Sequence, residues 1–144
     1  EVGSGLSGES ETKAFTDIPP VSQKTTDQLL DIIQSQLLPG LTASDFHAVT
    51  DAVESYSRLA GSCFEAIQGG PYNGRLLNQR VAWLKELGVH GIGQSSWGPT
   101  LFCFFDSKEA AKEFKRNLPD DNSGQKLIVD IVKADNQGAV ISRS

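Results

Sequence analysis

The run VHGIGQSSWGPTLFCFF, residues 89–105, holds the sharpest change of character in this sequence. Residues 89–92 predict a short strand, and the apolar run 101–105 predicts a second strand that is buried on both faces. The residues between them, 93–99, are mostly small or polar and predict a loop. We therefore expect two neighbouring strands joined by a glycine-rich loop.

Helical patterns surround this strand pair. Apolar residues at helical spacing predict a helix that starts at Thr25 and stops at Pro39-Gly40. A second begins at residues 42–45, which resemble a capping box with Asp in place of Glu, and continues to Ile67 as the longest element. Two further helices are expected: one over residues 77–87 with a left-handed cap at Gly88, and one from Ser107 to Pro119.

The carboxy-terminal part of the chain changes back to a strand pattern. Residues 127–133 predict a strand, and a turn at residues 136–138 can reverse the chain into a final short strand at 139–141. Helices followed by a few strands predict the α+β class, with helices packed on one face of a small antiparallel sheet.

The first 23 residues differ from the remainder. They mix small polar residues with Pro19-Pro20 and have few periodic apolar positions. We assign residues 1–23 to a tail or interdomain linker and residues 24–144 to one domain. Because the chain opens at Glu1 and contains no methionine, we expect it to be a piece of a longer protein.

Composition limits the partners. The net charge of -5 and the absence of Lys/Arg runs argue against nucleic acid and anionic membranes. The longest apolar stretch, residues 101–105, is far too short to span a bilayer, so we expect a soluble, cytoplasmic protein. Cys63 and Cys103 each lie beside Phe, which predicts buried free thiols and neither a disulfide nor a metal site.

The loop and its flanks, residues 91–100, form the candidate site. Glycines let backbone amides approach a ligand, and the hydroxyls of Ser95 and Ser96 add donors, so phosphate is the expected guest. The alternative is structural: the glycines only make a tight or bulged connection, Trp97 fills the core, and the serines cap local backbone.

Other ionisable residues give weaker signals. His90 adjoins the loop and is either an acid or base or a packed imidazole, whereas His47 lies on a predicted helix and is interpreted as structural. Four aspartates are conceivable metal ligands, but an Asp-Asp turn after a helix is more often a solvated cap, so no metal residue is assigned: Asp17, Asp106, Asp120 and Asp121.

The run GIGQSSWGPT, residues 91–100, resembles the third conserved motif of the GHMP kinase superfamily, in the form found in β-ribofuranosylaminobenzene 5'-phosphate synthases. Phe64, residues 68–70 (QGG) and Tyr72 are similar to a second stretch of those enzymes. Upstream, residues 5–8, with Glu11 and Phe15, resemble their interdomain linker. The superfamily's central phosphate-cradling motif, P-x3-GLGSS, has no counterpart in this sequence.

The resemblance implies a ferredoxin-like C-terminal domain of an enzyme that joins a 4-substituted benzoate to phosphoribosyl pyrophosphate, releasing CO2 and pyrophosphate on the route to methanopterin. It implies Mg²⁺ with ligands outside this chain, and as partners a phosphorylated small molecule, a missing N-terminal GHMP domain and, as a further option, a second copy in a homodimer. The isolated chain is expected to be inactive.

The resemblance also implies roles for individual residues, while the catalytic residues stay unknown. Ser95, Ser96 and the loop amides would bind phosphate, and Gln94 and Gln68 would read polar groups of the acceptor or ribose. Trp97 would form an aromatic wall, or else a core anchor; residues 68–70 have a helix terminus as their alternative reading. The expected binding residues are Gly91, Gly93, Gln94, Ser95, Ser96, Trp97, Gly98, Thr100, Gln68, Gly69 and Gly70.

Two other functions stay open. An ATP-dependent small-molecule kinase of the GHMP superfamily would use a similar loop beside ATP, although such kinases usually carry a glycine-dominated third motif. A ligand-binding module without chemistry is the second alternative, because a helix-covered small sheet can act as a sensor.

Overall fold

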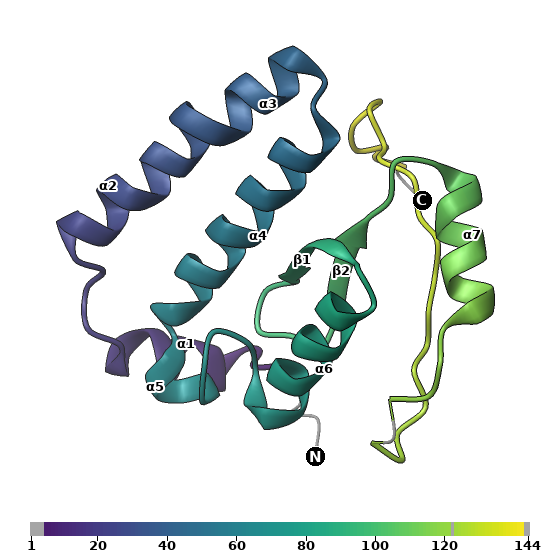
Figure 1. Cartoon of the computed structure of the whole chain (residues 1–144). Coiled ribbons are helices and arrows are strands. Elements are labelled where there is room, and N and C mark those ends of the chain that lie inside the picture. The colour runs from purple at the N-terminus through teal and green to yellow at the C-terminus, as the bar shows by residue number, and fades with distance from the viewer. Residues whose placement is uncertain (1–4, 122, 143–144) are drawn as a thin grey trace.

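The computed structural model describes residues 5–121 and 123–142. Figure 1 shows a two-stranded antiparallel sheet among helices, which confirms the α+β class and the small antiparallel sheet. The elements, in chain order, are α1 (Glu9–Asp17), α2 (Gln23–Asp31), the π-helix η1 (Ile32–Leu37), α3 (Leu38–Ala43), α4 (Phe46–Ser62), α5 (Glu65–Gln68), α6 (Gly74–Glu86), β1 (His90–Gln94), β2 (Leu101–Phe104) and α7 (Lys108–Asn117).

Helices α2, η1 and α3 form one continuous helical run, so the prediction that Pro39-Gly40 stops the first helix is wrong. The amide of Leu38 donates to the carbonyl of Ile33, five residues earlier, as in a π-turn. This wider turn precedes Pro39, whose missing amide hydrogen and bulky ring would disturb an ordinary α-turn. The run ends instead at Ser44, which adopts a left-handed φ of 54°.

Helix α4 is the longest single α-helix of the described residues, although the continuous run of α2, η1 and α3 is longer, and the ends of α4 differ from the prediction. Its cap is Asp45, whose carboxylate accepts a hydrogen bond from the Ala48 amide at 3.0 Å. The Thr42 hydroxyl donates to the Leu38 carbonyl instead. The helix stops at Ser62 rather than Ile67, and a separate turn, α5, follows it.

The two faces of the strand pair pack against different helices. On one face Ile92, Leu101 and Cys103 join Leu77 and Val81 of α6 in the hydrophobic core, and Phe114 of α7 packs against the same cluster. On the other side, α4 lies along β1. The register is irregular between His90 and Gly93, which marks a bulge in β1.

The prediction that the second strand is buried on both faces is wrong. Phe102 is 37% exposed and Phe104 is 42% exposed. Their rings contact each other with centroids 5.8 Å apart. Helix α4 packs mainly on β1, so it leaves these two rings partly in water.

The predicted strands at 127–133 and 139–141 are also wrong. Both segments lack regular structure, and the exposed fractions of Ile128, Val132, Val140 and Ile141 lie between 87% and 92%. The first segment runs beside α7, where the Lys115 ammonium donates to the carbonyl of Val129 (Figure 1). Strand propensity without an available sheet edge does not make a strand.

Short-range predictions in this half of the chain are confirmed. Gly88 has a left-handed φ of 78° just after α6, and the Ser107 hydroxyl accepts from the Ala110 amide at the start of α7. Cys63 and Cys103 are free thiols, but they are half-buried and not fully buried as predicted. Burial raises the pKa of Cys103 above its ordinary value.

Among the helices of residues 5–121 and 123–142, none combines the length and the apolar character needed to cross a membrane.

Candidate functional site

The glycine–serine loop, residues 91–100, contains eight of the predicted binding residues, and the structure brings Gln68 to it. The side-chain amide of Gln94 donates to the carbonyl oxygen of the Gln68 side chain at 3.3 Å. Gln68 itself is buried, and its own amide donates to the carbonyl of Gly61 at 2.9 Å. The loop is therefore linked to the end of α4.

Gln94 holds the loop from inside. Its side-chain oxygen accepts from the Asn73 backbone amide at 2.6 Å, and its amide donates to the Ser96 carbonyl at 2.9 Å. The Asn73 side chain in turn donates to the carbonyl of Trp97. The sequence did not predict this role of Asn73, because its only signal is its position in the turn before α6.

We expect Gln94→Ala to destabilise the chain by about 1–3 kcal/mol, because the Asn73 amide loses its acceptor and the side-chain oxygen of Gln68 loses its donor. Chemical denaturation at neutral pH measures this change. Gln79→Ala is the matched control, since Gln79 is exposed on α6. Equal stability of the two variants would contradict the bracing role.

The glycines of β1 allow close packing against its neighbours. A Cβ at Gly91, where φ is 66°, would lie 2.8 Å from the Phe104 ring and 3.0 Å from Thr50 of α4. A Cβ at Gly93 would lie 2.3 Å from the Phe102 ring and 2.7 Å from the Ser57 hydroxyl. Packing alone thus accounts for these two glycines.

Gly69 and Gly70 lie at a helix end. Gly69 closes α5 with a left-handed φ of 76° and has open space around it, whereas Gly70 packs against the Asn78 side chain. The two glycines therefore have the geometry of a helix terminus.

At the tip of the loop, residues 95–97, several donors make no hydrogen bond within the described residues. The amides of Ser95 and Gly98 are used inside the loop, donating to the carbonyls of Thr100 and Ser95 at 2.9 and 3.0 Å. Within the described residues, the exposed hydroxyls of Ser95 and Ser96 and the amides of Ser96 and Trp97 make no hydrogen bond. Ser96 has a φ of 50°, a left-handed conformation of the kind found in anion-binding turns.

Trp97 points away from the tip into the core. Trp97 is 6% exposed, and its ring packs edge to face against the rings of Phe64 and Phe15, with centroids 5.0 and 5.6 Å away. The indole nitrogen donates to the Glu11 carboxylate at 2.9 Å. These contacts correspond to the core anchor and leave the indole little surface for stacking on a ligand.

The ionisable residues near the loop form no metal centre. His90 and His47 are both exposed and stack edge to face, with ring centroids 5.3 Å apart. Throughout residues 5–121 and 123–142, no group of three or more His, Cys, Asp or Glu side chains could hold a metal ion. The described residues therefore do not fit an Mg²⁺ site.

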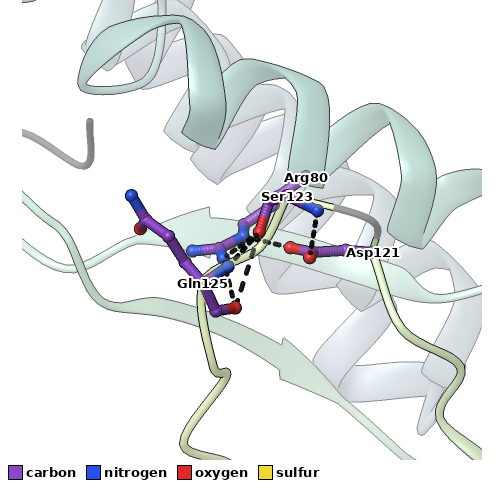
Figure 2. A network of polar contacts seen from close by, with 4 residues as sticks. All are labelled: Arg80, Asp121, Ser123 and Gln125. Atoms are coloured by element: carbon purple, nitrogen blue, oxygen red, sulfur yellow. Dashed lines mark hydrogen bonds and ion pairs between the residues drawn. The ribbon is translucent and has the colours of Figure 1, made fainter.

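Asp121 has a different role from the metal ligand considered above. Figure 2 shows its carboxylate paired with Arg80, whose guanidinium also donates to Ser123 and to the carbonyl of Gln125. Both side chains of the ion pair are buried. The network ties α6 to the chain after α7 and was not predicted from the sequence.

The loop tip does not line either of two shallow hollows found on the surface. One, an open groove of about 720 Å³, lies between α2 and α4 and includes Lys24, Asp27 and Arg58. The other lies on α1. Ser95 and Ser96 are themselves exposed, so a ligand bound to their hydroxyls would lie at the surface of this chain.

Comparison with known proteins agrees with the motifs. The chain is 25% identical over 108 residues to the "Beta-ribofuranosylphenol 5'-phosphate synthase" of Methanothermobacter thermautotrophicus, an alignment of 75% of this chain and 32% of that protein. It thus spans about a third of the length of that relative. No solved structure matches it. Residues 37–123 match the family described as GHMP kinases C terminal, so this chain belongs to the C-terminal domain family of the GHMP kinases.

Proposed function

We propose that this chain supplies one wall of the substrate site of a synthase similar to β-ribofuranosylaminobenzene 5'-phosphate synthase. That enzyme would join a 4-substituted benzoate to phosphoribosyl pyrophosphate and release CO2 and pyrophosphate. The name of the Methanothermobacter relative, a synthase of a ribofuranosyl 5'-phosphate, supports this choice. A second domain would complete the site, because the loop tip here is open.

The observation that carries the proposal is the set of available donors at the loop tip. Two serine hydroxyls and two consecutive amides, those of Ser96 and Trp97, have no partner within the described residues. A departing pyrophosphate accumulates negative charge, and fixed donors stabilise such charge without reorganising during the reaction. Ser95 and Ser96 therefore bind a phosphate group of the donor substrate.

The remaining predicted residues act on the loop and not on the substrate. The side chains of Gln94 and Gln68 form hydrogen bonds with each other and with the backbone, so they hold the loop in position. Trp97 contributes its amide to the ligand while its indole anchors the loop. Gly69 and Gly70 shape the turn that carries Gln68.

Mg²⁺ would neutralise charge on the pyrophosphate when bound, as the resemblance implies. The described residues of this chain offer no cluster of ligands for it. We therefore place its ligands in the other part of the enzyme and derive no step through the ion.

Replacing Ser95 and Ser96 together with Ala should lower turnover roughly 10²-fold, the usual cost of removing a donor to developing charge. The measurement is release of labelled carboxyl from 4-aminobenzoate, with phosphoribosyl pyrophosphate, by an enzyme that joins this chain to an N-terminal GHMP domain. The Tm should stay almost unchanged because both hydroxyls are exposed.

The Ser95 and Ser96 experiment has one control variant and two outcomes that would contradict the proposal. Ser62→Ala, at an exposed serine of α4, should leave turnover unchanged. Unaltered turnover in the double variant would remove the loop tip from the mechanism. Consumption of ATP with a small-molecule acceptor, without release of CO2, would instead assign the enzyme to the GHMP kinases.

A further inference from the structure

We infer that α1 is a clasp that positions the glycine–serine loop. The clasp consists of Gly5, Glu11 and Phe15, all from the stretch that the sequence assigns to a tail or linker. The inference rests on the proposed function only in saying what the positioned loop binds. The contacts themselves stand independently of any reaction.

The first contact is polar and buried. The indole N–H of Trp97 donates to the carboxylate of Glu11 at 2.9 Å, and the indole is almost completely buried. That N–H is the one polar atom of the tryptophan side chain, so without Glu11 it would be buried with no acceptor. A charged acceptor makes this hydrogen bond stronger than a neutral one would be.

The second contact is aromatic. Phe15, one helical turn after Glu11, lies edge-on to Trp97 and also to Phe64, with centroids 5.6 and 6.2 Å apart. Trp97 and Phe64 contact each other as well. Phe15 is 56% exposed, so this part of the clasp lies on the surface, whereas Ala14 of the same helix is buried.

The third contact joins two backbones. A Cβ at Gly5 would lie 2.3 Å from the carbonyl oxygen of Gly98. Only glycine allows the segment before α1 to pass this close to the loop. Gly5, Glu11 and Phe15 therefore meet the loop at consecutive points along the chain.

Trp97 is thereby fixed from two sides. Asn73 and Gln94 hold the loop backbone from the interior, and the clasp holds the indole from α1. Ser96, whose hydroxyl is available for a ligand, is the residue directly before Trp97. Release of α1 would free the indole and with it the orientation of both serines, so Glu11 and Phe15 are positioning residues.

The test uses this chain with the substitution Trp83→Phe. The chain has only two tryptophans, so the tryptophan fluorescence then comes from Trp97 alone. Glu11→Ala should shift its emission to longer wavelength and speed hydrogen exchange at the Ser95 and Gly98 amides roughly tenfold. Glu11→Gln keeps an acceptor oxygen and should restore most of the protection. Glu9→Ala, an exposed glutamate of the same helix, should behave as wild type.

Unchanged emission and exchange in both Glu11→Ala and Phe15→Ala would overturn the clasp. A second measurement separates it from the proposed function: titration with inorganic pyrophosphate of the enzyme that joins this chain to an N-terminal GHMP domain. If wild type binds pyrophosphate and Glu11→Ala weakens binding several-fold, with rescue by Glu11→Gln, positioning is supported. If wild type binds no pyrophosphate, the proposed phosphate site is wrong. The Trp97 emission and the hydrogen exchange of the loop amides still test whether α1 positions the loop.

Discussion

Replacing Arg80 with Met should lower the free energy of unfolding by about 3–5 kcal/mol, the cost of leaving one partner of a buried ion pair alone. Arg80 is 9% exposed and Asp121 is 4% exposed in their side chains. Methionine fills much of the same volume, but it has neither the positive charge nor the hydrogen-bond donors that pair with the Asp121 carboxylate. Urea denaturation at neutral pH measures the loss.

The network around Arg80 explains why a single residue should matter so much. Its guanidinium donates to Asp121, to the Ser123 hydroxyl at 3.1 Å and to the Gln125 carbonyl at 3.3 Å (Figure 2). These acceptors lie more than 40 residues away in the sequence. The pair is thus the main polar link that holds the segment after α7 on α6, among the residues that the structure describes.

The same pair makes stability depend on pH on the acid side. Burial raises the pKa of Asp121, but hydrogen bonds from Ser123 and Arg80 outweigh it and hold the pKa below its ordinary value. A carboxyl with a lowered folded pKa contributes stability above its unfolded pKa and loses it as pH falls through the folded value. Between neutral pH and about pH 3, wild type should lose more stability than Arg80→Met.

Two variants test whether the ion pair is the cause. Arg75→Met removes an exposed arginine from the same helix and should change stability by less than about 0.5 kcal/mol. Asp121→Asn combined with Arg80→Met removes both charges and should recover part of the loss. Equal stability of Arg80→Met and Arg75→Met would rule out a stabilising role for the network.

The features that the sequence predicted correctly depend on neighbouring residues. Gly88 and Ser107 end and begin helices through their own backbone or hydroxyl, so local chemistry was sufficient. The strand pair around the glycine–serine loop was also predicted, because its apolar pattern and its glycines lie within one short stretch. Residues 37–123, the part matched by the family, contain all of these features.

The features that it missed depend on distant residues. Trp97 and Glu11 are 86 positions apart, and Arg80 and Asp121 are 41 apart, so no local pattern could pair them. Pro39 was misread because a π-turn, invisible in the residue types, absorbs it. Residues 127–133 have the composition of a strand, but a strand also needs an edge to pair with.

The candidate site shows the same division. The sequence identified the residues of the loop but could not tell which of them face outward. Ser95 and Ser96 do, whereas Gln94, Gln68 and Trp97 turn inward to hold the loop. A motif indicates that a set of residues works together, and only the packing separates those that can meet a ligand from those that support them.

Gly61→Ala should destabilise the chain by about 1–3 kcal/mol, the cost of forcing an extra carbon into a packed contact. A Cβ at Gly61 would lie 2.0 Å from the carbonyl oxygen of Pro71 and 3.0 Å from its carbonyl carbon. Both atoms belong to the backbone, so no side-chain rotation can relieve the contact. Helix propensity alone predicts the opposite sign, because Ala is favoured over Gly inside a helix by about 0.5–1 kcal/mol.

The sign of the measured change therefore separates the two explanations. Chemical denaturation should show a loss for Gly61→Ala and almost none for Ser62→Ala, an exposed neighbour in α4. A gain in stability would mean that α4 does not press against the turn at Pro71. Because the Gly61 carbonyl accepts from Gln68, which contacts Gln94, displacement of α4 should also speed hydrogen exchange at the loop amides. Slow exchange in a destabilised Gly61→Ala variant would show that the loop is held by its other contacts, through Asn73 and Glu11, without help from the end of α4.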